Sequence, residues 1–273
     1  MKMKILLVSS LFFSIFVLSQ NMRFMYELKF VKDSTNRQEV ITELLNLDTT
    51  PKGSTFYPSK SIVQDSIFAE YDKAIDKEAF RKSTDWEKGR VKISYYVAKN
   101  YKDQTVTVRD FFGGNYFSYS ETSPVKWKIE KETSKMATYA VQKATASYGG
   151  REWTAWFTAQ IPISDGPYKF SGLPGLIIKM EDSKKDYRFE LVKSEKLKSE
   201  YDQSKRFGKI IKVKKEEFAK LVKRQQTDPV SFLPPPPVST NPDEPAIASA
   251  SNKKFQKKVE DEAKKDNNPI EFY

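Results

Sequence analysis

Apolar and polar residues alternate along much of this chain, and this pattern is typical of half-buried β-strands. Near the start, Phe24, Tyr26, Leu28 and Phe30 alternate with polar neighbours and predict a strand. A second alternation over 153–160 carries aromatic residues on both faces, so we expect that strand to be covered on both sides. Further strands are predicted at 40–48, 91–99, 104–112, 115–121, 125–131, 136–146, 176–180, 187–193 and 208–213. The segment 40–48 also fits a helix, but the turn residues that follow it favour a strand.

Helical spacing of apolar residues occurs in fewer places. Ile67, Phe68 and Tyr71 predict a helix over 61–82, and Phe218 with Leu221 predicts another over 215–226. A third, polar helix is expected at 253–265. The predicted fold class is therefore α+β and mainly antiparallel β. We expect one curved sheet, incompletely closed, with two or three helices.

The N-terminus predicts export. Lys2 and Lys4 precede an apolar run from Ile5 to Leu18, which is typical of a signal peptide cleaved near Gln20. The run is shorter than the roughly 20 residues of a membrane-spanning helix. The expected organisation is a signal peptide at 1–19, a β-rich globular domain at 20–227, a Pro-rich loop or linker at 228–252, and a polar helix with a C-terminal tail at 253–273. The Pro-rich stretch fits a spacer better than a ligand for a partner's aromatic groove.

Composition excludes several kinds of chemistry. The chain has no cysteine and no histidine, which removes disulfides, cysteine nucleophiles, Ser-His-Asp triads, histidine bases and the usual zinc sites. Glu152, Asp165, Glu181 and Asp182 are available carboxylates, but their spacing defines no acid–base pair. No catalytic residue, metal site or cofactor is therefore predicted.

The net charge of +11 is concentrated in the stretch 184–226. One interpretation is a surface for anionic lipid headgroups or an acidic partner. Acidic residues are interspersed with the lysines, however, and this favours an ordinary solvated region.

The segment 151–180 combines aromatic and glycine-rich sequence. Gly172 and Gly175 bracket a proline, so we expect a positive φ at one or both of them. Asp165 precedes a Gly-Pro turn and is expected to accept a turn hydrogen bond rather than to act as a base. Lys169 is expected to be exposed.

The aromatic residues of this segment have two possible roles. They either fill the sheet interior, which the composition favours, or line a groove for an apolar or peptide ligand. On the second interpretation the candidate binding residues are Trp153, Trp156, Asp165, Gly166, Pro167, Tyr168, Phe170, Gly172, Leu173, Pro174 and Gly175.

The same segment resembles a known family. GPYKFSGLPGLI over 166–177, with AWFTAQIPI over 155–163 before it, is similar to the GLPGLI proteins of Bacteroidetes-type bacteria. The similarity extends to VKWKIEKET at 125–133, QKAT at 142–145 and NNPIEFY at 267–273. Val141 departs from the pattern, since relatives often carry cysteine there. The resemblance implies a secreted or envelope protein of unassigned activity.

Together these features predict an exported, non-catalytic binding or interaction protein of the cell envelope. It would be periplasmic, outer-membrane associated or secreted, with no transmembrane segment in the mature chain. Its partner would be an envelope protein, a peptide or a lipid, and not a nucleic acid. Two alternatives stay open: a hydrolase that uses only carboxylate, serine or lysine chemistry, and a structural surface component.

Overall fold

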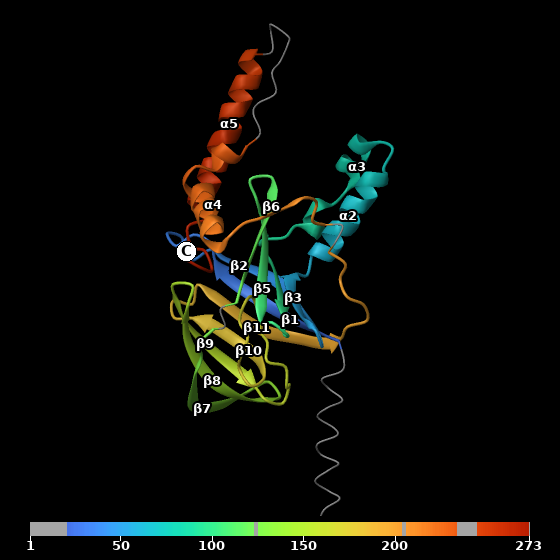
Figure 1. The fold of residues 1–273 in the computed structure, drawn as a ribbon. Coiled ribbons are helices and arrows are strands. Elements are labelled where there is room, and N and C mark those ends of the chain that lie inside the picture. Colours follow the sequence, from blue (N-terminus) through green and yellow to red (C-terminus); the bar gives the residue numbers. More distant parts are fainter. Residues whose placement is uncertain (1–20, 123–124, 204–205, 234–244, 273) are drawn as a thin grey trace, which may run out of the picture.

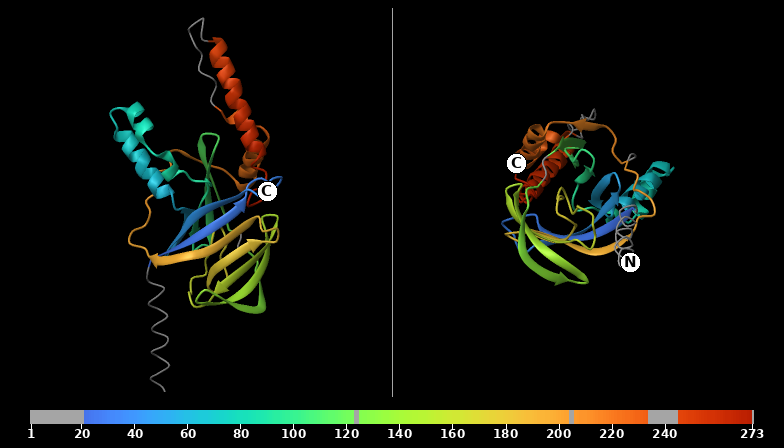
Figure 2. Two further views of the ribbon diagram at one scale, coloured as in Figure 1. Left: turned by 180° about the vertical axis from the view of Figure 1, so that it is seen from behind. Right: turned by 60° about the horizontal axis from the view of Figure 1, so that its bottom comes forward.

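A single mixed sheet organises the molecule. The computed structural model describes residues 21–122, 125–203, 206–233 and 245–272; the expected signal peptide and the four-proline run lie outside them. Twelve strands follow the order β12-β6-β5-β4-β3-β2-β1-β11-β10-β9-β8-β7. Neighbouring strands are antiparallel except for the parallel pair β12–β6. The sheet is open, because β12 and β7 are two unpaired edges. It is also curved, so both features are as predicted (Figures 1 and 2).

The strands have the following bounds: β1 Met22–Val31, β2 Val40–Thr50, β3 Gly53–Pro58, β4 Tyr96–Asn100, β5 Thr105–Phe112, β6 Asn115–Glu121, β7 Lys128–Met136, β8 Tyr139–Tyr148, β9 Arg151–Thr158, β10 Leu176–Asp182, β11 Tyr187–Lys196 and β12 Ile210–Lys212. The α-helices are α2 Ser61–Lys73, α3 Lys77–Ser83, α4 Lys215–Thr227 and α5 Pro245–Lys264, with 3₁₀ turns η1 at Trp86–Gly89 and η2 at Pro229–Phe232.

The period-two pattern places the core on one face of the sheet. In β1, Phe24, Tyr26 and Leu28 are almost fully buried, and in β9 Trp153 and Phe157 are buried with them. The opposite face of β9 is only partly covered, so the expectation of a strand buried on both sides was wrong. The predicted strand at 91–99 begins later than expected, at the first residue of β4. The segment before it contributes side chains to a cavity instead.

The helices differ from the prediction in number and length. The described residues contain four α-helices rather than two or three. The expected helix 61–82 is two helices, because Asp76 accepts a hydrogen bond from the backbone N–H of Ala79 and starts a new helix. The expected helix at 253–265 already begins at Pro245, a residue favoured at the first helical position.

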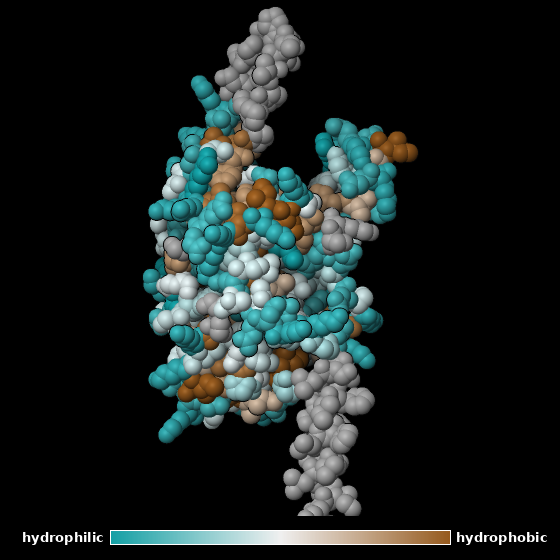
Figure 3. All heavy atoms as spheres, viewed as in Figure 1, coloured by the Kyte–Doolittle hydropathy of each residue, from teal (hydrophilic) through white to brown (hydrophobic). Residues whose placement is uncertain are grey.

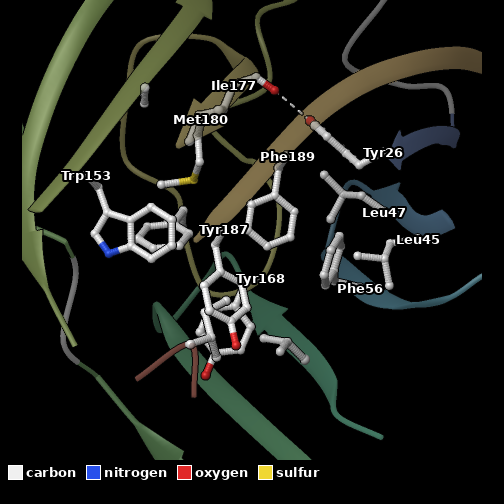
Figure 4. Close-up of a cluster of buried hydrophobic side chains, with 14 of the residues drawn as sticks. Tyr26, Leu45, Leu47, Phe56, Trp153, Tyr168, Ile177, Met180, Tyr187 and Phe189 are labelled. Carbon is white, nitrogen blue, oxygen red and sulfur yellow. Dashed lines mark hydrogen bonds between the residues drawn. The ribbon is translucent and has the colours of Figure 1, made fainter. Parts of the chain in front are cut away.

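The segment between β9 and β10 lies on the concave side of the sheet. Its Tyr168, Phe170 and Leu173 belong to the same buried cluster as the strands around them. Figure 2 shows the sheet curving around this segment, with α4 and α5 together at one end. In Figure 4, Tyr26 of β1 donates a hydrogen bond to the carbonyl oxygen of Ile177 in β10, 2.7 Å away. The glycine-rich segment is thus built into the core.

Candidate binding pocket

Asp165 anchors the buried segment to β4. Its carboxylate accepts hydrogen bonds from the backbone N–H of Gly166 and from the hydroxyl of Tyr101, both at 2.6 Å. The same carboxylate forms a buried ion pair with Lys99, whose ammonium also donates to the carbonyl oxygens of Gly166 and Phe170. Asp165 is therefore a turn acceptor, as predicted, and also one half of an ion pair that the sequence did not reveal.

Burial lowers the pKa of Lys99, while the neighbouring carboxylate of Asp165 opposes that shift. Both side chains are enclosed and have satisfied partners. A buried pair of this kind fixes a chain segment in one position, and removal of either partner leaves an uncompensated charge. Lys99 and Asp165 consequently form a support for the loop rather than an accessible reactive site.

The two glycines around Pro174 have backbone conformations that exclude most side chains. Gly172 has φ of 97° and Gly175 has φ of 146°, so positive φ occurs at both positions. At Gly175 a Cβ atom would lie only 2.0 Å from the carbonyl oxygen of Thr158. The loop therefore needs glycine at 175 for both reasons, while Pro174 is exposed at its surface.

The aromatic candidates separate into core and surface. Trp153 and Phe170 pack together with ring centroids 4.8 Å apart, and the Trp153 indole donates to the carbonyl of Tyr148. Leu173 and Pro167 are also buried. Trp156 is half-buried on the other face of β9, where the ammonium of Lys143 lies 5.8 Å from its ring. Among the eleven candidates, Tyr168 alone lines the cavity described below.

Lys169 is buried, so the expectation of an exposed side chain was wrong. It is 3% exposed. Its ammonium group forms ion pairs with Glu121 at 2.8 Å and Glu271 at 2.6 Å, and donates a hydrogen bond to the hydroxyl of Tyr119. Lys169 therefore joins the loop, β6 and the C-terminal tail, three segments distant in sequence.

The C-terminal tail lies against the sheet. The amide of Asn268 donates to the carbonyl of Val31 at 2.7 Å, and its side-chain oxygen accepts from the guanidinium of Arg151 at 2.6 Å. The hydroxyl of Tyr187 donates to the backbone carbonyl of Asn268 at 2.7 Å, and the following Ile270 is buried. These contacts hold the tail as one wall of a cavity.

That cavity has a volume of about 390 Å³ and is bounded by several separate parts of the chain. They are the segment 92–95, the inward-facing side of β5, Tyr168 of the loop, the inner face of α4 and the tail at 266–271. Phe30 and Tyr187 complete its walls from β1 and β11; their rings are stacked 5.8 Å apart. Figure 3 shows hydrophobic atoms around the nearby tip of the β5–β6 hairpin, where Phe111 is exposed.

Polar groups line this aromatic cavity. Burial raises the pKa of Asp110 to about 6, although hydrogen bonds from Ser94 and from the backbone N–H of Phe111 oppose the shift. Burial also raises the pKa of Tyr95 well above its ordinary value. Within the described part of the chain, the buried hydroxyl of Tyr95 and the side-chain oxygen of Gln225 have no hydrogen-bond partner.

The backbone at Tyr168 adds a further sign of a specialised site. Its φ is 54°, a left-handed conformation that is uncommon for a bulky side chain. Residues held in such conformations cost about 1–3 kcal/mol and cluster at ligand-binding and switch regions. The strained residue is the member of the glycine-rich segment that lines the cavity.

Sequence reasoning missed most of the pocket. Asp110 could have been noticed from the sequence, because it follows the buried Val106 and Val108 at a spacing of two along β5. Its side chain is therefore expected on the inward face of that strand. A carboxylate among inward positions is unusual and indicates a special environment. Tyr95 and Gln225 had no comparable signal, since their positions depend on how distant segments meet.

The described ranges contain no group of three or more acidic, cysteine or histidine residues that could hold a metal ion. Asp182, one half of the acidic pair Glu181-Asp182, instead pairs with Arg151 at 2.9 Å. In the same ranges no helix has the length and apolarity needed to cross a membrane.

Comparisons with known proteins give a fold and a short family match. A family model described as a protein of unknown function (Porph_ging) matches residues 150–179, the glycine-rich segment and its two strands. A comparison with curated proteins finds no match. Two solved structures, of PNGF-II in the P21 and C2 space groups, have TM-scores of 0.54 and 0.53 at 15% and 17% sequence identity.

Each structural match covers 76% of this chain but 34% of the PNGF-II chain. The chain therefore spans about a third of the length of the solved proteins it matches. At this level of identity the likeness concerns the fold alone. The curved sheet is a known arrangement, and the pocket must be interpreted from its own residues.

Proposed function

We propose that this chain is an exported binding protein of the GLPGLI type, and that the cavity beside Tyr168 is its ligand site. The observation that carries the proposal is an aromatic cavity with two polar atoms, the Tyr95 hydroxyl and the Gln225 oxygen, that lack protein partners among the described residues. Pockets for small ligands are typically apolar, with a few polar groups that orient the ligand.

The two unpartnered atoms favour ligand binding through their free-energy cost. A buried polar group without a hydrogen bond costs about 1–3 kcal/mol. A ligand that supplies the missing partners recovers that cost, and the aromatic walls add contact area. The supporting structure around the cavity is rigid, because Asp165 and Lys169 fix the loop through ion pairs. Such a cavity is already formed before the ligand arrives.

Export is the second part of the proposal and rests on the first 19 residues. Their charge and apolar pattern predict cleavage that leaves Gln20 or Asn21 at the N-terminus. N-terminal sequencing of the protein from an envelope or culture fraction tests this. Recovery of the chain with Met1 intact, in the cytoplasmic fraction only, would contradict it.

The competing function is a hydrolase that depends on carboxylates. Asp110 favours it, since a carboxyl with a pKa of about 6 has the protonation behaviour of a general acid or base. Against it stand the partners of the two other carboxylates that line the cavity: Glu271 pairs with Lys169, and Asp266 lies 3.4 Å from the ammonium of Lys32. A ligand recovered unchanged after prolonged incubation supports binding, whereas a ligand that is cleaved supports the hydrolase.

A cavity-filling substitution tests the ligand site. Val222 of α4 lines the cavity, so Val222→Trp should occupy it, while Lys223→Trp places the same ring on the exposed face of the helix. The neutral fluorescent probe N-phenyl-1-naphthylamine should bind the wild type and Lys223→Trp saturably, and Val222→Trp weakly or not at all. Equal probe binding by all three proteins, or by none, would contradict the proposed site.

A further inference from the structure

Three of the polar groups that line the cavity can each accept a hydrogen bond. Asp110 projects from the inner face of β5, Gln225 from α4 and Tyr95 from the segment before β4. An ionised carboxylate and an amide oxygen only accept, and a phenol hydroxyl can do so. The three groups come from three separate parts of the chain, and the fold brings them to the wall of one cavity.

The carboxylate of Asp110 lacks a counterion. It forms no salt bridge with any described residue. Asp266 is a second carboxylate near Asp110, and its negative charge raises the pKa of Asp110 further. The local electrostatic field therefore favours a cation at this position.

The lysines near the cavity do not compensate the charge of Asp110. The ammonium of Lys169 is held by Glu121, Glu271 and the Tyr119 hydroxyl. The ammonium of Lys32 lies 3.4 Å from Asp266, and Lys92 is exposed at the rim. None of them pairs with Asp110 in the part of the chain that the structure describes. Among the described residues no cation compensates Asp110, so a bound ligand can supply the positive charge.

We propose that the cavity binds an organic amine, with its ammonium group beside Asp110 and its carbon skeleton against the aromatic walls. This inference rests on the proposed binding function and names its ligand class. An ammonium group has three N–H donors and no acceptor, so it can donate to acceptors of the kind that line this cavity. Aromatic faces also attract cations, an effect that strengthens when water is excluded.

Other ligand classes fit less well. An anion would meet the carboxylates of Asp110, Asp266 and Glu271 among the lining residues. Of the two lysines in the lining, Lys32 already pairs with Asp266 and Lys92 is exposed. A neutral alcohol could donate one hydrogen bond to Asp110 but would leave its charge uncompensated. Hydrogen bonds to charged groups are worth roughly twice those between neutral groups. The three classes can therefore be separated by matched probes that differ only in their polar end.

The experiment is calorimetric titration of the full mature chain at pH 7.5 with 2-phenylethylammonium, 2-phenylethanol and 3-phenylpropionate. These probes share a phenyl ring and a short chain. We expect the ammonium compound to bind at least about tenfold more tightly than the alcohol, as one charge-assisted hydrogen bond implies. The carboxylate compound should bind most weakly.

Asp110→Asn tests the role of the charge, and Asp103→Asn is its matched control in the exposed turn before β5. Asp110→Asn should abolish the preference for the ammonium probe, and it should weaken alcohol binding much less than ammonium binding. Asp103→Asn should leave all affinities as in the wild type. Melting curves confirm that each variant is folded, so a lost preference cannot be attributed to unfolding.

Two results would overturn the amine assignment alone. One is equal or tighter binding of the alcohol or the carboxylate probe by the wild type. The other is failure of all three probes while N-phenyl-1-naphthylamine still enters the cavity and Val222→Trp excludes it. If the fluorescent probe also fails to enter the wild type, the proposed ligand site itself is wrong.

Discussion

At the scale of single residues, Asp110 shows how a site group can oppose stability. Its pKa in the folded protein is about 6, above the ordinary value of 3.8. Because the folded state binds the proton more tightly, stability falls as pH rises from about 4 through about 6. At neutral pH the ionised carboxylate is therefore a destabilising group, as expected where a function requires a charge in an apolar setting.

Asp110→Asn should consequently stabilise the protein at pH 7.5, by about 1–3 kcal/mol from the size of the shift. Near pH 3.5 the carboxyl is protonated in the folded state and largely protonated in the unfolded state, so the advantage should disappear. Thermal melting at both pH values measures this. Asp103→Asn, at an exposed position, should show no such gain. A destabilised Asp110→Asn at pH 7.5 would contradict the environment described for this residue.

At the scale of elements, Gly175 controls how the chain enters β10. A side chain there would meet the carbonyl oxygen of Thr158 and force a positive φ on an L-residue. Gly175→Val should destabilise the fold by about 2–4 kcal/mol, or several degrees in Tm for a domain of this size. Gly208→Val is the control, since Gly208 has open space around its Cα and no positive φ. Equal melting temperatures for the two variants would refute this role for Gly175.

The elements also show what the sequence could predict. Period-two alternation located most strands, because one face of each strand must be apolar when the sheet covers a single core. β6 was predicted at its observed bounds. The break between α2 and α3 was missed, because apolar spacing continues through it while a local cap at Asp76 starts a new helix. Periodicity reports which face is buried and carries little information on where a helix is interrupted.

The candidate site was less predictable than the fold. Gly172 and Gly175 were identified from their turn chemistry, and Tyr168 from its place in the same segment. Asp110 and Gln225 were not, because their significance depends on which residues lie across the cavity. Burial of a charged residue such as Lys169 was equally hidden, since its partners are 48 and 102 residues away in sequence.

At the scale of the whole molecule, Lys169 connects the interior of the sheet with the end of the chain. It pairs with Glu121 on β6 and with Glu271 in the tail, and these contacts position the wall that closes the cavity. Glu121 has a second partner, Lys215 at the start of α4. Glu271 depends on Lys169 for its counterion, so it is the more sensitive of the two carboxylates.

Lys169→Ala should destabilise the protein by about 3–5 kcal/mol, because it leaves buried carboxylates without their cation. Lys184→Ala, at an exposed lysine, should change the melting temperature little. The double variant Lys169→Met/Glu271→Met removes both charges and keeps apolar volume, so it should regain part of the loss. A Lys169→Ala protein that melts like the wild type would contradict the buried network. The losses of stability in Lys169→Met and Glu271→Met can be added and compared with the loss in the double variant. A double-variant loss as large as that sum would show that Glu271 does not depend on Lys169.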